Sequence, residues 1–170
     1  MEEVWQKTFK NKEVKFPNEI AVEYCNQLYS LTNNLVIAKV EKYNKSLDDM
    51  NEIAPIMTIA NASTSMLLRE GKAEQYLGEV SGKDKFTYEM YLTGIKTPKY
   101  KYRFCFIENG VYPYPTMLVI DTDIANELKI QTRIKCDDET TFKGVLLKIL
   151  NSKKMYEVIE GLMTINSKAE

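Results

Sequence analysis

Hydrophobic residues recur at the spacing of an amphipathic helix near both ends of the chain. The first such segment, residues 17–32, opens with Pro17, which is favoured in the first turn of a helix. Its apolar positions are Ile20, Tyr24, Leu28 and Leu31. Residues 138–165 show the same 3.6-residue period twice, once on each side of Asn151-Ser152. The pattern predicts an N-terminal helix and a C-terminal helical hairpin.

Strand-like segments occupy the middle of the chain, residues 35–136. Residues 35–40 form a short β-branched run, which is typical of a strand. Residues 86–93 and 100–107 alternate between two kinds of side chain, as the two faces of a strand require. Residues 132–136 fit one further strand. We therefore expect an antiparallel meander of about four to six strands.

Residues 61–80 fit two structures equally well. Their apolar positions are compatible with a helix that Gly71 interrupts, and also with a hairpin that turns at Gly71-Lys72. Neither the periodicity nor the propensities decide between the two.

The dipeptide Asn109-Gly110 is the strongest short-range signal of a β-hairpin. A two-residue turn at this point would place Phe106 opposite Pro113 and Tyr102 opposite Met117. Alternation then predicts a core face made of Tyr100, Tyr102, Phe104, Phe106, Pro113, Pro115, Met117 and Val119. The other, partly wet face would carry Lys101, Arg103, Cys105, Ile107, Tyr112, Tyr114, Thr116 and Leu118. Both prolines lack an N–H donor, so we expect the end of the return strand that carries them to lie at a sheet edge.

These elements predict one α+β domain over residues 1–170. Residues 1–16 are compatible with a short helix or with an arm that packs through Trp5 and Phe9. A chain of 170 residues is long enough to bury a core without disulfides or metals. No internal repeat and no linker divides it.

Composition narrows the possible chemistry. The chain has no histidine, which removes Ser-His-Asp and Cys-His nucleophile activation and histidine-based zinc sites. Three distant cysteines without a C-x-x-C pair favour a reducing compartment. The charged N-terminus lacks the apolar core of a signal peptide, so we expect a cytoplasmic protein that spans no membrane. We expect no cofactor, and oligomeric state is not predictable from these features.

A basic–aromatic patch stands out against a net charge of −1. It consists of Lys96, Lys99, Lys101, Arg103, Tyr112 and Tyr114. Residues 83–103 carry six cations and two acidic residues, a local charge of +4. Cations that alternate with tyrosine favour single-stranded nucleic acid or an acidic protein surface. The same pattern also fits plain cross-strand packing at a lysine-guarded sheet edge.

An acidic cluster follows the predicted hairpin. Asp121 and Asp123, with Lys129 close behind, would suit a Mg²⁺ site and phosphodiester hydrolysis. This arrangement loosely resembles restriction-type nucleases, although in that family the acidic residues sit on adjacent strands. Aspartate at a strand-to-helix junction is also a standard helix N-cap, and we favour that interpretation.

Two smaller features point to packing or solvation. Lys153 and Lys154 lie in the first turn of the last predicted helix, where their charges oppose the helix dipole. We favour a solvated helix end, and a bound phosphate or a carboxylate partner is the alternative. Cys105 lies beside Lys101 and Arg103 in the sequence, but no histidine is present to activate it. We expect a small packed residue.

The leading hypothesis is a non-enzymatic protein-binding module that uses the basic–aromatic patch. Abundant lysine, asparagine and isoleucine with only three arginines suit a low-GC bacterium or its phage. Such a protein would act as an accessory, immunity or anti-defence protein by occluding or adapting a partner protein. The alternatives are a single-stranded nucleic-acid-binding protein and a Mg²⁺-dependent phosphodiesterase that uses Asp121, Asp123 and Lys129.

Overall fold

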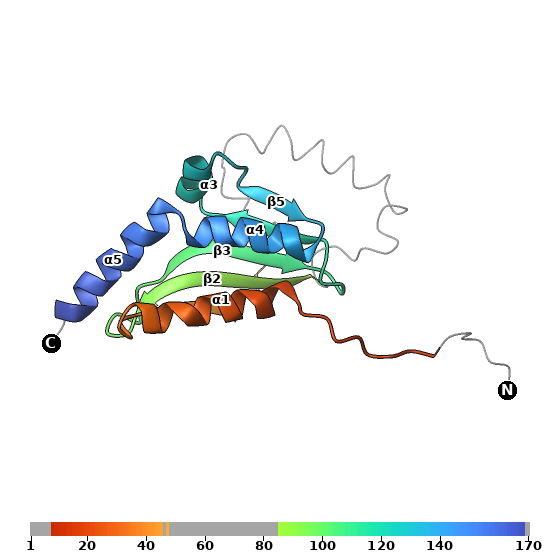
Figure 1. Cartoon of the computed structure of the whole chain (residues 1–170), viewed down its shortest axis with the longest axis horizontal. Helices are drawn as coiled ribbons and strands as arrows, with labels where there is room; N and C mark the ends of the chain where they lie inside the picture. Colours follow the sequence, from red (N-terminus) through yellow and green to blue (C-terminus); the bar gives the residue numbers. More distant parts are fainter. Residues whose placement is uncertain (1–7, 46, 48–84, 169–170) are drawn as a thin grey trace.

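The computed structural model describes residues 8–45, 47 and 85–168, which form a sheet covered by helices on one face (Figure 1). The elements are α1 (Pro17–Leu31), β1 (Val36–Lys42), β2 (Phe86–Gly94), β3 (Tyr102–Asn109), β4 (Thr116–Ile120), α3 (Thr122–Leu128), β5 (Arg133–Cys136), α4 (Glu139–Leu150) and α5 (Lys153–Lys168). The predicted α+β class is confirmed. The ambiguous segment 61–80 lies outside the described residues, as does Trp5.

The five strands of the described chain form an antiparallel meander in the order β1-β2-β3-β4-β5. Each strand therefore pairs with its neighbours in the sequence, as the alternating segments predict. Val36 lies opposite Gly94 at one end of the β1–β2 pair, and Ile107 lies opposite Leu118 in the β3–β4 pair.

The core lies between the sheet and the helices. Helix α1 lies against β1, α4 lies alongside α1 and contacts β5, and α5 contacts α3, β1 and β2 (Figure 1). Ile20, Leu92 and Phe142 are fully buried between these layers. Burying one such side chain stabilises a fold by about 1.5–3 kcal/mol.

The N-terminal ends of α1 and α4 both carry local signals that begin a helix. At α1, Pro17 occupies the first turn and the Phe16 N–H donates to Glu19 Oε2 over 2.7 Å. At α4, the Thr141 N–H donates to Asp138 Oδ1 over 2.7 Å. These contacts satisfy amide groups that have no partner within the helix.

The β3–β4 hairpin begins at Asn109 as predicted, but its predicted register was wrong. Asn109 lies opposite Thr116, so residues 110–115 form the connection instead of a two-residue turn. Phe106 consequently lies opposite Val119 and not opposite Pro113. The two prolines explain the difference, because neither can donate a ladder hydrogen bond and the return strand starts only after Pro115.

A β-bulge also reverses the predicted faces of β3. Tyr91 lies opposite Arg103 and Met90 opposite Cys105, which leaves Phe104 as an extra residue in β3. One extra residue moves every later side chain to the other face. Cys105 and Ile107 are therefore buried under the helices with Leu118. Phe106, Met117 and Val119, predicted to face the core, occupy the opposite face of the sheet, which we call the open face.

The C-terminal helices are confirmed, and they meet at a bend at Asn151-Ser152 (Figure 1). Ser152 Oγ accepts a hydrogen bond from the Met155 N–H over 3.3 Å, as a helix N-cap does. Among the described residues, no helix has the length and apolar character that crossing a bilayer requires.

Candidate functional site

The structure distributes the basic–aromatic patch over three regions. Lys96 and Lys99 lie in the β2–β3 connection, before β3 begins. Tyr112 lies in the β3–β4 connection, after β3 ends, and is 77% exposed. The eight residues of β3 span about 25 Å. The two lysines and Tyr112 therefore do not share one local surface.

Tyr114 lies on the helix-covered side of the sheet. Its ring centroid is 6.4 Å from that of Phe142 in α4, and it packs against the core. The hydroxyl oxygen is buried and has no hydrogen-bond partner among the described residues. Burial raises the pKa of Tyr114 to about 12. The side chain contributes to the core and is not grouped with Lys101 and Arg103.

Lys101 and Arg103 meet on the open face around one carboxylate. Lys101 Nζ lies 2.5 Å from Glu89 Oε1, and Arg103 Nε lies 2.7 Å from Glu89 Oε2. Glu89 is only 6% exposed. Burial alone would raise the pKa of Glu89, but hydrogen bonds from Lys101 and Arg103 and their charges outweigh it and lower that pKa. Two of the four cations of the patch, Lys101 and Arg103, thus share one carboxylate of the chain itself.

Replacing Glu89 with glutamine should reduce stability in a pH-dependent way. The folded protein holds the pKa of Glu89 below its ordinary value of 4.5, so the charged contacts stabilise the fold above that pH. Their contribution is lost as the pH falls through the lowered pKa. Because both cations are about a third exposed, we expect a deficit of about 1 kcal/mol at neutral pH. Urea unfolding from pH 7 to pH 3 measures it.

Glu157→Gln provides the matched control, because Glu157 forms an exposed ion pair with Lys153 at 3.8 Å. An exposed pair of this kind contributes little, so this variant should stay within about 0.5 kcal/mol of wild type at every pH. A deficit of Glu89→Gln that does not shrink below pH 4.5 would contradict the assigned role of the carboxylate.

The acidic cluster caps helices. Asp121 Oδ1 accepts hydrogen bonds from the N–H groups of Asp123 and Ile124 over 3.0 and 3.2 Å, which confirms the N-cap interpretation. Asp123 forms an ion pair with Lys154 at 3.4 Å. Lys129 is the C-cap of α3, in the left-handed region at φ 56°. No group of three histidine, cysteine, aspartate or glutamate residues in the described ranges is arranged to hold a metal ion.

Glu127 supplies the carboxylate that the start of α5 favours. Its Oε1 and Oε2 accept hydrogen bonds from the N–H groups of Lys153 and Lys154 over 2.6 and 3.0 Å. This contact ties α3 to α5 across the bend at Asn151-Ser152. The sequence favoured a solvated helix end, with a carboxylate as an alternative. The structure shows the alternative, with the carboxylate supplied by the chain itself.

The cysteines are buried and unpaired. Burial raises the pKa of Cys25 to about 12 and that of Cys136 to about 11, and it raises the pKa of Cys105 as well. The prediction that Cys105 is a small packed residue is confirmed. A thiol with a raised pKa is a poor nucleophile at neutral pH.

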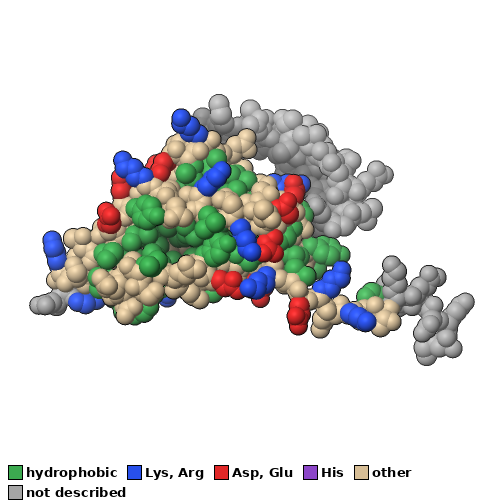
Figure 2. Space-filling model, in the orientation of Figure 1, with side chains coloured by type: hydrophobic (Ala, Val, Ile, Leu, Met, Phe, Trp, Pro, Cys, Tyr) green, Lys and Arg blue, Asp and Glu red, His purple; other side chains and the backbone are tan. Residues whose placement is uncertain are grey.

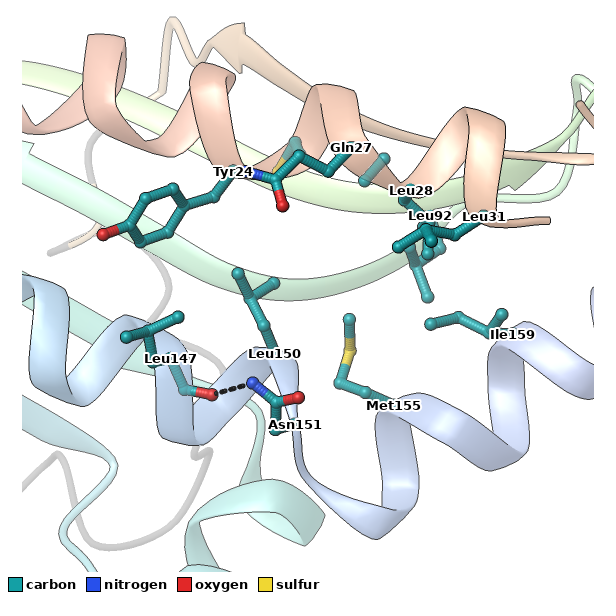
Figure 3. Close-up of a pocket in the computed structure, with 12 residues that line it drawn as sticks. Tyr24, Gln27, Leu28, Leu31, Leu92, Leu147, Leu150, Asn151, Met155 and Ile159 are labelled. Atoms are coloured by element: carbon teal, nitrogen blue, oxygen red, sulfur yellow. Dashed lines mark hydrogen bonds between the residues drawn. The ribbon is translucent and has the colours of Figure 1, made fainter.

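A groove with a volume of about 270 Å³ opens between α1 and the bend of α4 and α5 (Figure 3). Side chains of α1 form one wall, and side chains of α4 and α5 form the other. Two strands contribute to the lining from beneath. The lining residues are Tyr24, Cys25, Gln27, Leu28, Leu31, Ala38, Leu92, Leu147, Leu150, Asn151, Met155 and Ile159. Ten of these twelve side chains are hydrophobic, so we call this feature the apolar groove.

The apolar groove is flanked by charges at the N-terminal ends of α1 and α4. Lys15 pairs with Glu23 at 2.6 Å, and Lys143 pairs with Glu139. Toward the C-terminal ends of these helices the rim is apolar, and hydrophobic side chains gather between the helices on the molecular surface (Figure 2). Leu31 is 75% exposed and Leu147 is 47% exposed.

Sequence periodicity did not identify the apolar groove. It predicted Leu31 as a core position, and the structure corrects this, because Leu31 lies in the last turn of α1 at the groove rim. Leu147 gave the one available signal, since it is apolar but falls outside the period that Phe142, Leu146 and Ile149 define. A single exposed apolar residue is common on protein surfaces, so Leu147 indicates a contact surface only together with Leu31 across the groove.

Comparison of the chain with protein-family models, with curated proteins and with solved structures found no match.

Proposed function

We propose that this protein is a non-enzymatic protein-binding module whose interface is centred on the apolar groove. In this proposal it occludes or adapts a partner protein, as accessory, immunity and anti-defence proteins of low-GC bacteria and their phages do. The observation that carries the proposal is a groove walled by two helices, with Leu31 and Leu147 exposed at its rim.

Exposed leucines at a groove rim favour a protein ligand. Leaving apolar surface in water costs about 25 cal/mol per Å², and a partner that covers it recovers that free energy. The groove is walled by helices on two sides, an arrangement that suits the apolar face of a partner helix (Figure 3). Met155 on one wall adds a flexible side chain that adapts to the shape of its ligand.

The apolar groove is a better candidate interface than the basic–aromatic patch, because at least half of the patch side chains contact other parts of the chain. Of the six patch residues, Tyr114 packs in the core, while Lys101 and Arg103 engage Glu89. Tyr112 keeps its exposed ring and remains a candidate contact. An interface at the groove and one at Tyr112 predict different effects of substitution, so one experiment separates them.

Photo-crosslinking identifies the partner and its site together. A photo-reactive phenylalanine analogue at position 31 or 147 should form an adduct with one protein in host cells, whereas the same analogue at Ile165 should not. Ile165 is 54% exposed on α5 but does not line the groove, so it controls for general stickiness. An adduct sensitive to nuclease would instead support nucleic-acid binding, and adducts confined to position 112 would return the interface to the β3–β4 connection.

Aspartate substitution should then abolish binding to the purified partner. Leu31→Asp and Leu147→Asp each place a charge in an apolar contact, and we expect at least a thirtyfold weaker Kd, the change for a loss of about 2 kcal/mol. Because both side chains are exposed, the variants should unfold within about 0.5 kcal/mol of wild type. Isothermal titration measures the Kd, with Ile165→Asp as the control. Wild-type affinity in both groove variants would refute the proposed interface.

A further inference from the structure

The outer edge of β1 has a defined set of outward-facing backbone groups. Within the described residues β1 is the terminal strand of the sheet, paired with β2 alone. The Tyr43 N–H donates to Thr87 O over 2.8 Å, and the Ile95 N–H donates to Leu35 O over 3.0 Å. Odd-numbered residues of β1 therefore direct their N–H and C=O groups toward β2. By the alternation of an antiparallel ladder, even-numbered residues direct theirs away from the sheet.

Among the described residues, a side chain next to the edge satisfies the first of these even-numbered residues, Val36. Thr32 Oγ1 donates to Val36 O and accepts from the Val36 N–H, over 3.2 and 3.1 Å. The Thr32 side chain thus closes the edge at its N-terminal end. Ala38, Val40 and Lys42 follow, and within the described part of the chain their outward N–H and C=O groups form an open stretch of ladder.

The side chains next to this open stretch define what it recognises. Lys39 and Glu41 are exposed on the open face of β1, with opposite charges two residues apart. On the helix-covered face of the sheet, α1 packs against β1 next to the same edge. Val22 and Tyr29, spaced i, i+7, lie on the flank of α1 that faces away from α4, and they are 38% and 39% exposed. One side of the edge is therefore charged and the other side is apolar.

We propose that the outer edge of β1 binds an extended segment of a partner protein, which adds to the sheet as an antiparallel strand. The segment carries an acidic residue opposite Lys39 and a basic residue opposite Glu41. Its intervening side chains are apolar and lie beneath Val22 and Tyr29. Main-chain hydrogen bonds to Ala38, Val40 and Lys42 supply affinity, and the alternating side chains supply specificity. This surface is distinct from the apolar groove, and its failure would leave the proposal for the groove intact.

Proline and alanine at position 40 give a matched pair for the test. Val40→Pro removes an outward N–H donor without removing a bond to β2, while Val40→Ala causes a similar loss of side-chain packing and keeps the donor. The probe is a short fluorescent peptide of alternating valine and charged residues, with glutamate and lysine placed opposite Lys39 and Glu41. Fluorescence anisotropy should show binding to wild type and to Val40→Ala, and about tenfold weaker binding to Val40→Pro.

A charge exchange tests the register and the chemistry. Lys39→Glu combined with Glu41→Lys should lose affinity for the first peptide and gain affinity for a peptide with its two charges exchanged. Equal binding by Val40→Pro and Val40→Ala, or no binding to wild type at peptide concentrations of about 1 mM, would overturn the proposal. Wild-type self-association that Val40→Pro abolishes, seen by sedimentation without peptide, would assign the edge to a second copy of the chain and also overturn it.

Discussion

Replacing Phe142 with alanine should lower the free energy of unfolding by about 3–5 kcal/mol. Phe142 is fully buried in α4, where its ring contacts Tyr114 from the β3–β4 connection. The substitution removes apolar contacts and leaves a cavity that the sheet and α4 cannot close, because both are held by other core residues. Urea unfolding followed by circular dichroism measures the change, and the midpoint should fall without a change in slope.

Tyr114→Phe is the informative companion to that variant. It keeps the ring against Phe142 and removes only the buried hydroxyl, which has no hydrogen-bond partner among the described residues. Deleting an unsatisfied buried group costs little, so stability should stay within about 0.5 kcal/mol of wild type or rise. A loss above about 1 kcal/mol would mean that the hydroxyl makes a hydrogen bond in the folded protein. Weaker binding of the partner protein by Tyr114→Phe would place Tyr114 in the interface.

A second large effect is expected where α5 meets the β2–β3 connection. Asn166 is fully buried and uses both ends of its amide: Nδ2 donates to Leu162 O over 2.7 Å, and Oδ1 accepts from the Lys96 N–H over 2.7 Å. Gly94 lies directly beneath, and an added Cβ would overlap the Asn166 amide and the Thr97 hydroxyl. Gly94→Ala should therefore lower the free energy of unfolding by about 2–3 kcal/mol.

The double variant distinguishes steric overlap from a general effect of glycine replacement. Asn166→Ala alone should cost about 1–3 kcal/mol, because it removes the acceptor of the Lys96 N–H. It also makes room for a methyl group at position 94, so the combined loss should fall below the sum by about 1 kcal/mol. Gly144→Ala is the control: its added Cβ meets nothing within 4 Å, and alanine favours helix α4 by about 0.5–1 kcal/mol. Additive losses would contradict direct contact.

The features that the sequence predicted correctly depend on interactions between residues that are close in the sequence. Pro17 and Asp121 predicted helix starts, and the structure places a helix start at each of them. Both signals act within three residues of the helix start. The strands were predicted by alternation within single segments. The predicted register was wrong at Pro113 and Pro115. The prediction gave the Asn109-Gly110 turn signal more weight than the missing N–H donors of the two prolines.

The candidate site was the least predictable part, because it joins distant segments. The apolar groove brings together residues 24–31, 147–151 and 155–159, and no local pattern links them. The basic–aromatic patch shows the reverse relation between sequence and space. Its residues are close in the sequence, but β3 separates them in the fold, and Glu89 forms ion pairs with two of them. Proximity along a strand does not place side chains on one surface.

The sequence by itself determined the α+β class, the three long helices, the order of the meander and the cap at Asp121. These depend on hydrophobic period and on hydrogen bonds between near neighbours, so they are encoded locally. Only the tertiary structure decided which faces are buried, since one extra residue at Phe104 reverses the alternation of β3. It also decided that Leu31 and Leu147 form a groove rim, because exposure depends on what the rest of the chain covers.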